Sequence, residues 1–159
     1  TLWHHWGVEA DAVIGHSIGE YAAAVTAKVL TLSDAARLVS ARARMMQALP
    51  STGPDRGAMI ALRASEEAAD QLLSESSVDL SLAAVNGPEN IVLSGRANAV
   101  DEVRILATER GINCRILSVS HAFHSPLMAS VADPFRETVE SVNLQLPNIP
   151  FISTVSGKI

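Results

Sequence analysis

The feature that most constrains this chain is the segment 15–19, in which a serine has a glycine two residues away on each side. Residues 11–15 read as a short buried strand, and an alanine-rich helical pattern follows from 18 to 27. A chain that changes from strand to helix within so few residues must turn sharply, and small neighbours let the two segments pass closely. This context predicts a nucleophile elbow that holds Ser17 in a strained conformation. The alternative is an ordinary turn in which Ser17 caps the helix.

The composition indicates a compact globular protein. Of 159 residues, 48% are hydrophobic and 18% are charged, a balance that supports one domain or two small subdomains. The net charge of −5 and the lack of a lysine or arginine run argue against nucleic acid as the main partner. Charged residues interrupt every apolar run well short of membrane-spanning length, so we expect no membrane partner.

Cysteine and histidine usage gives little sign of redox or metal chemistry. The single cysteine, Cys114, allows no internal disulfide, lies in a strand-like run and fits a cytoplasmic protein. His4 and His5 are adjacent at the end of a predicted helix over residues 1–6, which Gly7 closes. Adjacent residues on a helix point in different directions and no further ligand stands at metal spacing, so we predict no metal site.

An arginine interrupts the apolar face of the next helix. Ser33 and Asp34 are expected to cap this helix, which runs to about Leu49. Arg42 falls within its apolar stripe, whose members are Ala35, Leu38, Val39, Met45, Met46 and Leu49. A guanidinium facing a core is costly unless an anion pairs with it. Two interpretations remain open, a structural arginine (ion-paired or reaching the surface) or a site for a substrate carboxylate.

The middle of the chain predicts a separate subdomain. A turn-rich linker at 50–57 precedes strands at 58–62, 80–85, 91–94 and 112–119. Helices are expected at 65–74, capped by Ser65, and at 97–110, ended by Gly111. The order β-α-β-β-α-β is that of the ferredoxin-like plan. We therefore predict an α/β protein in which a small subdomain, 57–119, is inserted between 1–56 and 120–159. The last segment contains a helix beginning at Asp133 and a strand at 149–154.

Two histidines follow this inserted unit, in a loop that a proline closes at 126. A serine nucleophile needs a base within hydrogen-bond reach, and histidine titrates near neutrality. His121 and His124 are the candidates, and their spacing does not decide between them. The alternative is that both are loop residues without a catalytic role.

Taken together, Gly-His-Ser-Ile-Gly-Glu, the arginine on the second helix and Ser-His-Ala-Phe-His-Ser-Pro resemble the acyltransferase domain of modular type I polyketide synthases. That family is related to the malonyl-CoA:acyl carrier protein transacylases of fatty acid synthesis. The resemblance runs through essentially all of the chain, including Ala-Arg-Ala-Arg-Met-Met-Gln-Ala-Leu-Pro, Gly-Ala-Met-Ile-Ala and Val-Asn-Gly-Pro. It implies an α/β-hydrolase-like large subdomain with the ferredoxin-like unit inserted.

The resemblance assigns roles to individual positions. It implies that Ser17 is the nucleophile, that His124 is the catalytic histidine and that Arg42 binds the substrate carboxylate. His16, beside the nucleophile, and His121 and Phe123, in the specificity segment, would contribute to substrate binding. Ile18 would donate its backbone N–H to the oxyanion. In this family Ile18 and the His-Ala-Phe-His segment accompany malonyl selection, and Phe123 would fill the space of an α-methyl group.

The implied reaction is transfer of a malonyl group from malonyl-CoA, in two steps, to the phosphopantetheine thiol of an acyl carrier protein. The implied partners are the acyl-CoA thioester, the carrier domain and neighbouring synthase domains in polyketide biosynthesis, with no bound cofactor. The chain opens without methionine and stops after a strand-like run, so we expect a piece of a longer protein. The glutamine of the oxyanion hole and the group that orients the histidine would lie outside it, and the fragment alone could be inactive.

Two other functions remain open. A serine hydrolase, either an esterase or a patatin-like lipase, would use the same elbow, with water in place of the carrier thiol. A neutral ester needs no buried cation, so Arg42 argues against it. A catalytically incomplete scaffold fragment of a megasynthase is the non-enzyme alternative, and the intact set of Ser17, Arg42 and His124 argues against decay.

Overall fold

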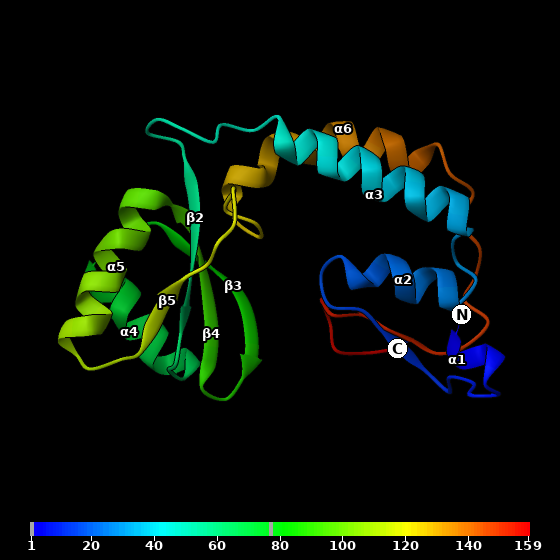
Figure 1. The fold of residues 1–159 in the computed structure, drawn as a ribbon, viewed down its shortest axis with the longest axis horizontal. Helices are drawn as coiled ribbons and strands as arrows, with labels where there is room; N and C mark the ends of the chain where they lie inside the picture. Colours follow the sequence, from blue (N-terminus) through cyan, green and yellow to red (C-terminus); the bar gives the residue numbers. More distant parts are fainter. Residues whose placement is uncertain (1, 77) are drawn as a thin grey trace. The chain divides into compact units, whose positions relative to one another are not determined.

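The computed structural model describes residues 2–76 and 78–159 (Figure 1). They form two compact units, one made of the chain up to Arg44 together with Pro134–Ile159, the other of Met45–Asp133. The predicted inserted subdomain, 57–119, falls within the second unit, and its exact limits stay a prediction. No helix in the described residues is long and apolar enough to cross a membrane.

The first unit contains a two-stranded parallel sheet and most of its helices. Its elements are α1 (Leu2–His5), β1 (Val13–Ile14), α2 (Gly19–Thr26), α3 (Leu32–Gln47), α6 (Ala129–Glu140) and β6 (Phe151–Ile152), the boundary between units falling within α3 and α6. β1 pairs with β6, Val13 opposite Phe151 and Ile14 opposite Ile152. Gly7 has a φ of 78° after α1, which confirms the predicted glycine cap.

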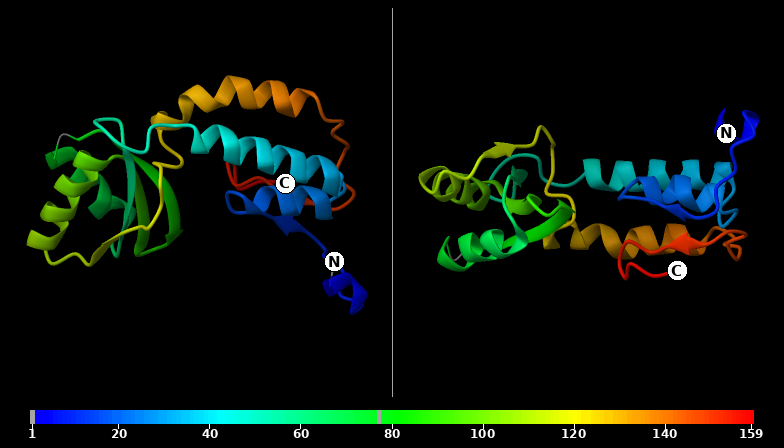
Figure 2. Two further views of the ribbon diagram at one scale, coloured as in Figure 1. Left: turned by 45° about the horizontal axis from the view of Figure 1, so that its top comes forward. Right: turned by 90° about the horizontal axis from the view of Figure 1, so that it is seen from below.

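Apolar side chains from three helices hold this unit together. Ala24, Leu30, Ala35 and Leu38 are buried, and Tyr21, Phe135, Val139 and Phe151 are among those that pack against them. Arg37 fixes α3 to the end of α6 by donating to the carbonyl and hydroxyl oxygens of Ser141, both at 2.9 Å. α3 and α6 lie side by side (Figure 2). Arg37 is therefore a structural arginine.

Three local predictions for this unit were wrong. β1 is not a buried strand, because Ile14 is 62% exposed: among the described residues β1 has a single neighbouring strand, which leaves one side uncovered. α3 is capped by Thr31, whose hydroxyl oxygen accepts from the Asp34 N–H at 3.0 Å, and not by Ser33. α6 begins at Ala129, so that Pro134 lies inside the helix and not at its start.

The second unit is a four-stranded antiparallel sheet with two helices on one face (Figure 1). Its elements are β2 (Gly57–Leu62), α4 (Glu66–Ser76), β3 (Leu80–Gly87), β4 (Asn90–Arg96), α5 (Ala97–Glu109), β5 (Cys114–Ile116) and the 3₁₀ helix η1 (Pro126–Met128). The strand order is β3-β4-β2-β5. The predicted sequence β-α-β-β-α-β is confirmed.

Alternating apolar residues of the central strands make the core beneath these helices. Ile60, Leu62, Ile91 and Leu93 are at most 1% exposed and pack with residues of α4 and α5 that include Leu72, Val100 and Val103. The Ser65 hydroxyl caps α4 by accepting from the Ala68 N–H at 3.2 Å, as predicted. β5 is shorter than predicted because, as an edge strand, it pairs only with Ile60–Leu62 of β2.

Candidate functional site

Ser17 adopts a left-handed backbone conformation between β1 and α2, with a φ of 51°. A residue with a β-carbon reaches this region at a cost of about 1–2 kcal/mol, so such residues persist only where their surroundings enforce them. The residue at the N-cap position of α2 is Ile18, whose side chain makes no capping hydrogen bond. The strained turn predicted for an elbow is therefore present, and Ser17 lies one residue before the cap position.

The two glycines around Ser17 have different roles. A β-carbon on Gly15 would lie 2.4 Å from backbone atoms of Gly19 and Glu20, so the strand and the helix cross where only glycine fits. A β-carbon on Gly19 would meet nothing within 4 Å. The close passage of strand and helix thus depends on the first glycine of the motif alone.

The first turn of α2 is tightly closed. The N–H groups of Gly19, Glu20 and Tyr21 donate to the carbonyl oxygens three residues earlier, at 2.9, 3.1 and 3.3 Å. Within the described part of the chain, no hydrogen bond uses the Ile18 N–H. This donor lies next to Ser17 at the positive end of the helix dipole, where it suits a developing negative charge. The Ile18 side chain is 49% exposed, and His16 is also exposed.

Arg42 differs from the other arginines of this chain. It is half-buried on α3, whereas every other arginine in the described residues is exposed. The ion pairs that the structure describes use Arg96, Arg104 and Arg110, and none uses Arg42. A half-buried guanidinium without a carboxylate partner in the described chain argues against the structural ion pair and favours an anion site.

The positive charge of Arg42 affects the pKa of Tyr21 on α2. Burial raises the pKa of Tyr21, the positive charge of Arg42 lowers it, and the negative charge of Glu20 raises it. Tyr21 lies one helical turn after Ser17, so the field of Arg42 reaches the first turns of the helix that follows the nucleophile. The sequence pattern of α2 carries no information about this relationship, because Arg42 belongs to a different helix.

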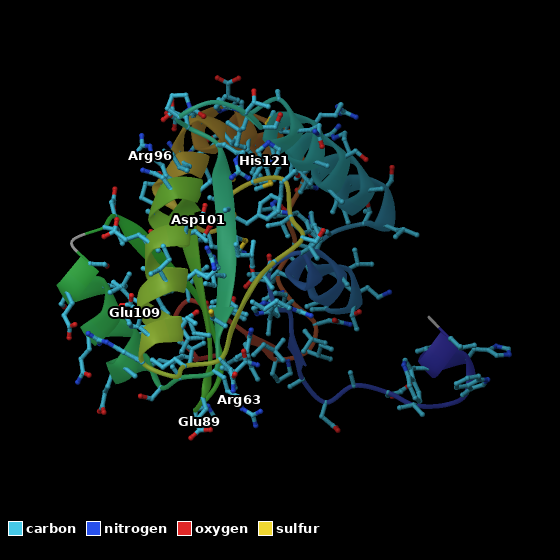
Figure 3. The ribbon with its side chains drawn as sticks, turned by 60° about the vertical axis from the view of Figure 1, so that its left-hand side comes forward. Arg63, Glu89, Arg96, Asp101, Glu109 and His121 are labelled. Atoms are coloured by element: carbon cyan, nitrogen blue, oxygen red, sulfur yellow. The ribbon has the colours of Figure 1, made fainter. Side chains whose placement is uncertain are left out.

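The two candidate histidines of the loop after β5 have different surroundings. His121 is 2% exposed, with its Nε2 3.2 Å from the Leu49 carbonyl oxygen and its Nδ1 2.9 Å from the Ser120 hydroxyl. Both ring nitrogens are engaged, which argues against a proton-transfer role. Figure 3 labels His121 at the end of the sheet where β2 begins.

His124 is exposed and, like Ser17, left-handed, with a φ of 60°. Lys28 is the third non-glycine residue of this kind in the described chain, and it directly follows the C-cap residue of α2, where this conformation is common. Ser17 and His124 have no such helix-end explanation. Phe123, beside His124, is half-buried and contacts the ring of His121 at a centroid distance of 6.2 Å.

Among the described residues no three histidine, cysteine, aspartate or glutamate side chains gather in a group that could hold a metal ion. His5 is exposed, and Cys114 is half-buried against the core of the second unit.

Two hollows in the second unit bear on where a site could lie. The larger, with a volume of about 560 Å³, is at the end of the sheet that includes Arg63 and Glu89. Cys114 is among the residues that line it, and none of the predicted site residues is. The smaller, of about 180 Å³, is lined by Leu49, Gly57 and His121, among others. Figure 3 places Arg63 and Glu89 at the end of the sheet opposite His121.

Comparison with known proteins gives consistent matches along the chain. The model of the acyl transferase domain family matches residues 1–158. Polyketide synthase GfsA of Streptomyces halstedii is 47% identical over 159 residues, which are 99% of this chain and 2% of that protein. The chain therefore spans a small part of the synthases it matches.

Solved structures agree in fold. The acyltransferase domain from the second module of the salinomycin polyketide synthase has 47% identity and a TM-score of 0.88, over 99% of this chain and 36% of that one. Malonyl-CoA:acyl carrier protein transacylase from Xanthomonas oryzae pv. oryzae has 36% identity and a TM-score of 0.89, over 99% of this chain and 51% of that one. The chain thus spans between about one third and one half of these two structures.

Proposed function

Because the chain belongs to the acyl transferase domain family, we propose that it is part of an acyltransferase that carries its acyl group as an ester on Ser17. The observation that carries this proposal is the left-handed conformation of Ser17, at the point where Gly15 lets β1 pass close to α2. An elbow of this kind presents a serine hydroxyl at the N-terminus of a helix, where a thioester carbonyl can be polarised.

In the proposed first step, the Ser17 oxygen attacks the thioester carbon of an acyl-CoA while His124 accepts the hydroxyl proton. The Ile18 N–H stabilises the oxyanion that forms. Collapse of the intermediate breaks the carbon–sulfur bond, and the proton on His124 passes to the departing CoA thiolate. The choice of His124 over His121 rests on the engagement of both His121 nitrogens.

In the second step, the phosphopantetheine thiol of an acyl carrier protein attacks the acyl-serine ester, with His124 accepting the thiol proton. A second oxyanion forms and collapses, the carbon–oxygen bond breaks, and Ser17 regains its proton from His124. In each half-reaction His124 takes one proton from the attacking group and returns it to the leaving group, so the proposed reaction needs no cofactor.

We propose malonyl as the acyl group, because its free carboxylate would pair with Arg42. A bidentate guanidinium–carboxylate contact is strong where it is partly removed from water, and Arg42 is half-buried near Tyr21. His16 and Ile18, beside the nucleophile, would contact the acyl chain. Phe123 would exclude an α-methyl group, which in an apolar pocket is a difference of about 1–3 kcal/mol. Selection of malonyl over methylmalonyl should therefore be real but incomplete.

The proposed architecture follows the family. The unit that carries Ser17 would be the α/β-hydrolase-like large subdomain, with a ferredoxin-like small subdomain inserted at 57–119 between 1–56 and 120–159. The strand order and the two helices on one face of the sheet support the second assignment. The proposed setting is a polyketide synthase, whose carrier and neighbouring domains would be the partners.

Intact-mass spectrometry of the complete acyltransferase domain tests this proposal. With malonyl-CoA we expect a malonyl adduct that is absent in Ser17→Ala and that is lost when a carrier protein bearing phosphopantetheine is added. A preference for methylmalonyl-CoA would contradict the substrate assignment. An adduct lost to water equally fast without carrier protein would instead indicate a serine hydrolase, and no adduct at all would indicate a scaffold.

A further inference from the structure

The segment 120–125 is held to the second unit at several points, and the first is His121. A carbonyl oxygen can only accept, so the Nε2 of His121 carries the proton that it donates to the Leu49 oxygen, at 3.2 Å. In the neutral ring Nδ1 is then an acceptor, and it takes the hydroxyl proton of Ser120 at 2.9 Å. The imidazole of His121 is thus buried and satisfied at both nitrogens.

The second attachment is a backbone contact at the start of β2. A β-carbon on Gly57 would lie 2.3 Å from the backbone nitrogen of Ala122 and 2.8 Å from its β-carbon. Ala122 itself is 1% exposed. The loop backbone therefore rests directly on the strand, at a place where any larger residue would push it away.

The third attachment closes the loop on itself. The Ser125 hydroxyl donates to the Ala122 carbonyl oxygen at 2.7 Å and accepts from the Leu127 N–H at 3.3 Å. This bond spans Phe123 and His124, so these two residues form the tip of a closed turn. Ser125 and Pro126 form a Ser-Pro pair at the start of η1, and this pair is the sequence signal that could have predicted the role of Ser125.

The segment His121–Ser125 thus divides into residues that attach and residues that are presented. His121, Ala122 and Ser125 are fixed to their surroundings, whereas Phe123 and His124 lie between them. The left-handed backbone of His124 requires such support, because a residue with a β-carbon leaves this conformation unless the neighbouring structure prevents it.

We propose that His121 is a positioning residue: its Nε2–H bond to the Leu49 carbonyl seats the loop that presents His124 and Phe123. This role rests on the proposed function of His124, and it replaces direct contact between His121 and the substrate. The ring of His121 also contacts Phe123 at a centroid distance of 6.2 Å, so the same seat orients the residue proposed to exclude the methyl group.

The kinetic test uses the complete domain and follows malonyl transfer to carrier protein. In His121→Leu we expect kcat to fall by about 10²-fold, because a catalytic group displaced by about 1 Å can lose this much rate. KM for malonyl-CoA should stay within about twofold, since Arg42 is untouched, and discrimination against methylmalonyl-CoA should weaken. His121→Gln keeps an N–H donor at comparable reach and should recover most of kcat.

Ser120→Ala is the matched control, because it removes the partner of Nδ1 and leaves the Leu49 bond intact. Its kcat should stay within about threefold of the unaltered domain, as for loss of one modest hydrogen bond. An unchanged kcat in His121→Leu, or equal losses in His121→Gln and His121→Leu, would overturn the proposal.

A spectroscopic measurement tests the seat without relying on activity or on the leucine variant folding. Long-range ¹H–¹⁵N NMR correlation at neutral pH should show His121 as the Nε2–H tautomer. It should also show His124 resonances unchanged in His121→Gln. An Nδ1–H tautomer would overturn the proposed bond. Absence of any malonyl adduct on Ser17 in the unaltered domain would count against the proposed function instead. The tautomer of His121 would still test the hydrogen bond to the Leu49 carbonyl.

Discussion

The positive charge of Arg42 on α3 lowers the pKa of Tyr21 on α2, opposing the larger upward effect of burial. Tyr21 is one helical turn beyond Ser17, so an anion held by Arg42 would lie near the helix that begins at the nucleophile. The proposed carboxylate site and the proposed nucleophile would therefore belong to two adjacent helices of one unit.

This relationship can be measured because Tyr21 is the only tyrosine in the sequence. In Arg42→Ala we expect the Tyr21 pKa to rise further, since the cation that stabilises the phenolate is removed. Ultraviolet absorbance of the tyrosinate during a pH titration measures this change, with Arg44→Ala, an exposed residue of the same helix, as control. An unchanged pKa in Arg42→Ala would contradict the assignment. In a longer chain, any further tyrosine would be replaced by phenylalanine for this measurement.

The raised pKa of Tyr21 also predicts a pH dependence of stability. In the unfolded chain Tyr21 titrates at its ordinary pKa of 10.0, and in the folded chain it titrates at higher pH. Its contribution to stability is therefore full below pH 10.0, the ordinary value, and is lost as pH rises through the folded-state pKa. As pH is raised, urea unfolding should show a smaller loss of stability in Tyr21→Phe than in the unaltered protein. Equal losses in the two proteins would contradict this account.

Replacement of Arg42 should separate acidic from neutral acyl groups. We expect Arg42→Ala to lower kcat/KM for malonyl-CoA by about 10²-fold, the effect of losing a charge-assisted hydrogen bond of up to about 3 kcal/mol. Loading of acetyl-CoA, which has no free carboxylate, should be unaffected. Single-turnover mass spectrometry of both substrates provides the comparison, again with Arg44→Ala as control. Equal losses for the two substrates would argue against a carboxylate site.

The conformation of Ser17 predicts an unusual ranking of stabilities. Both Ser17→Gly and Ser17→Ala remove the nucleophile, but glycine adopts a φ of 51° without strain. We therefore expect Ser17→Gly to be more stable than Ser17→Ala by about 1 kcal/mol. Chemical unfolding of the two inactive variants measures the difference, and equal stability would show that the backbone at this position is unstrained.

The two glycines of the motif should respond differently to alanine. Gly15→Ala places a methyl group against the backbone of Glu20, and we expect a loss of about 3 kcal/mol or more. Gly19→Ala opens onto free space at the start of α2 and should change stability by no more than about 1 kcal/mol, toward greater stability. Thermal unfolding of both variants tests this, and a similar loss in each would contradict the assigned crossing point.

Periodicity and turn chemistry predicted most of the element order. The glycine caps at Gly7 and Gly111, the cap at Ser65 and the β-α-β-β-α-β order are local properties of the sequence, and each is present. The elbow conformation of Ser17 was predicted for the same reason, since a strand, a small residue and a helix in succession leave few routes for the backbone.

Features that depend on distant partners could not be predicted in this way. The exposure of Ile14 depends on how many strands pair beside β1, and the short length of β5 depends on where β2 offers partners. The buried state of His121 depends on the Leu49 carbonyl, which lies far earlier in the chain. A histidine pattern in a loop carries no information about such a partner, so the spacing alone left His121 and His124 equivalent.

If the loop 121–124 sets the acyl group as proposed, the close approach of Gly57 to Ala122 has a consequence for exchanging that preference between synthases. Grafting the four residues His121–His124 from one domain into another would transfer the tip of the loop without its foundation. If the recipient has a bulkier residue where this chain has Gly57, the grafted backbone cannot take up its position on β2. A graft therefore has to include residues that are distant in sequence: Gly57 at the start of β2, and the segment after α3 that provides the Leu49 carbonyl.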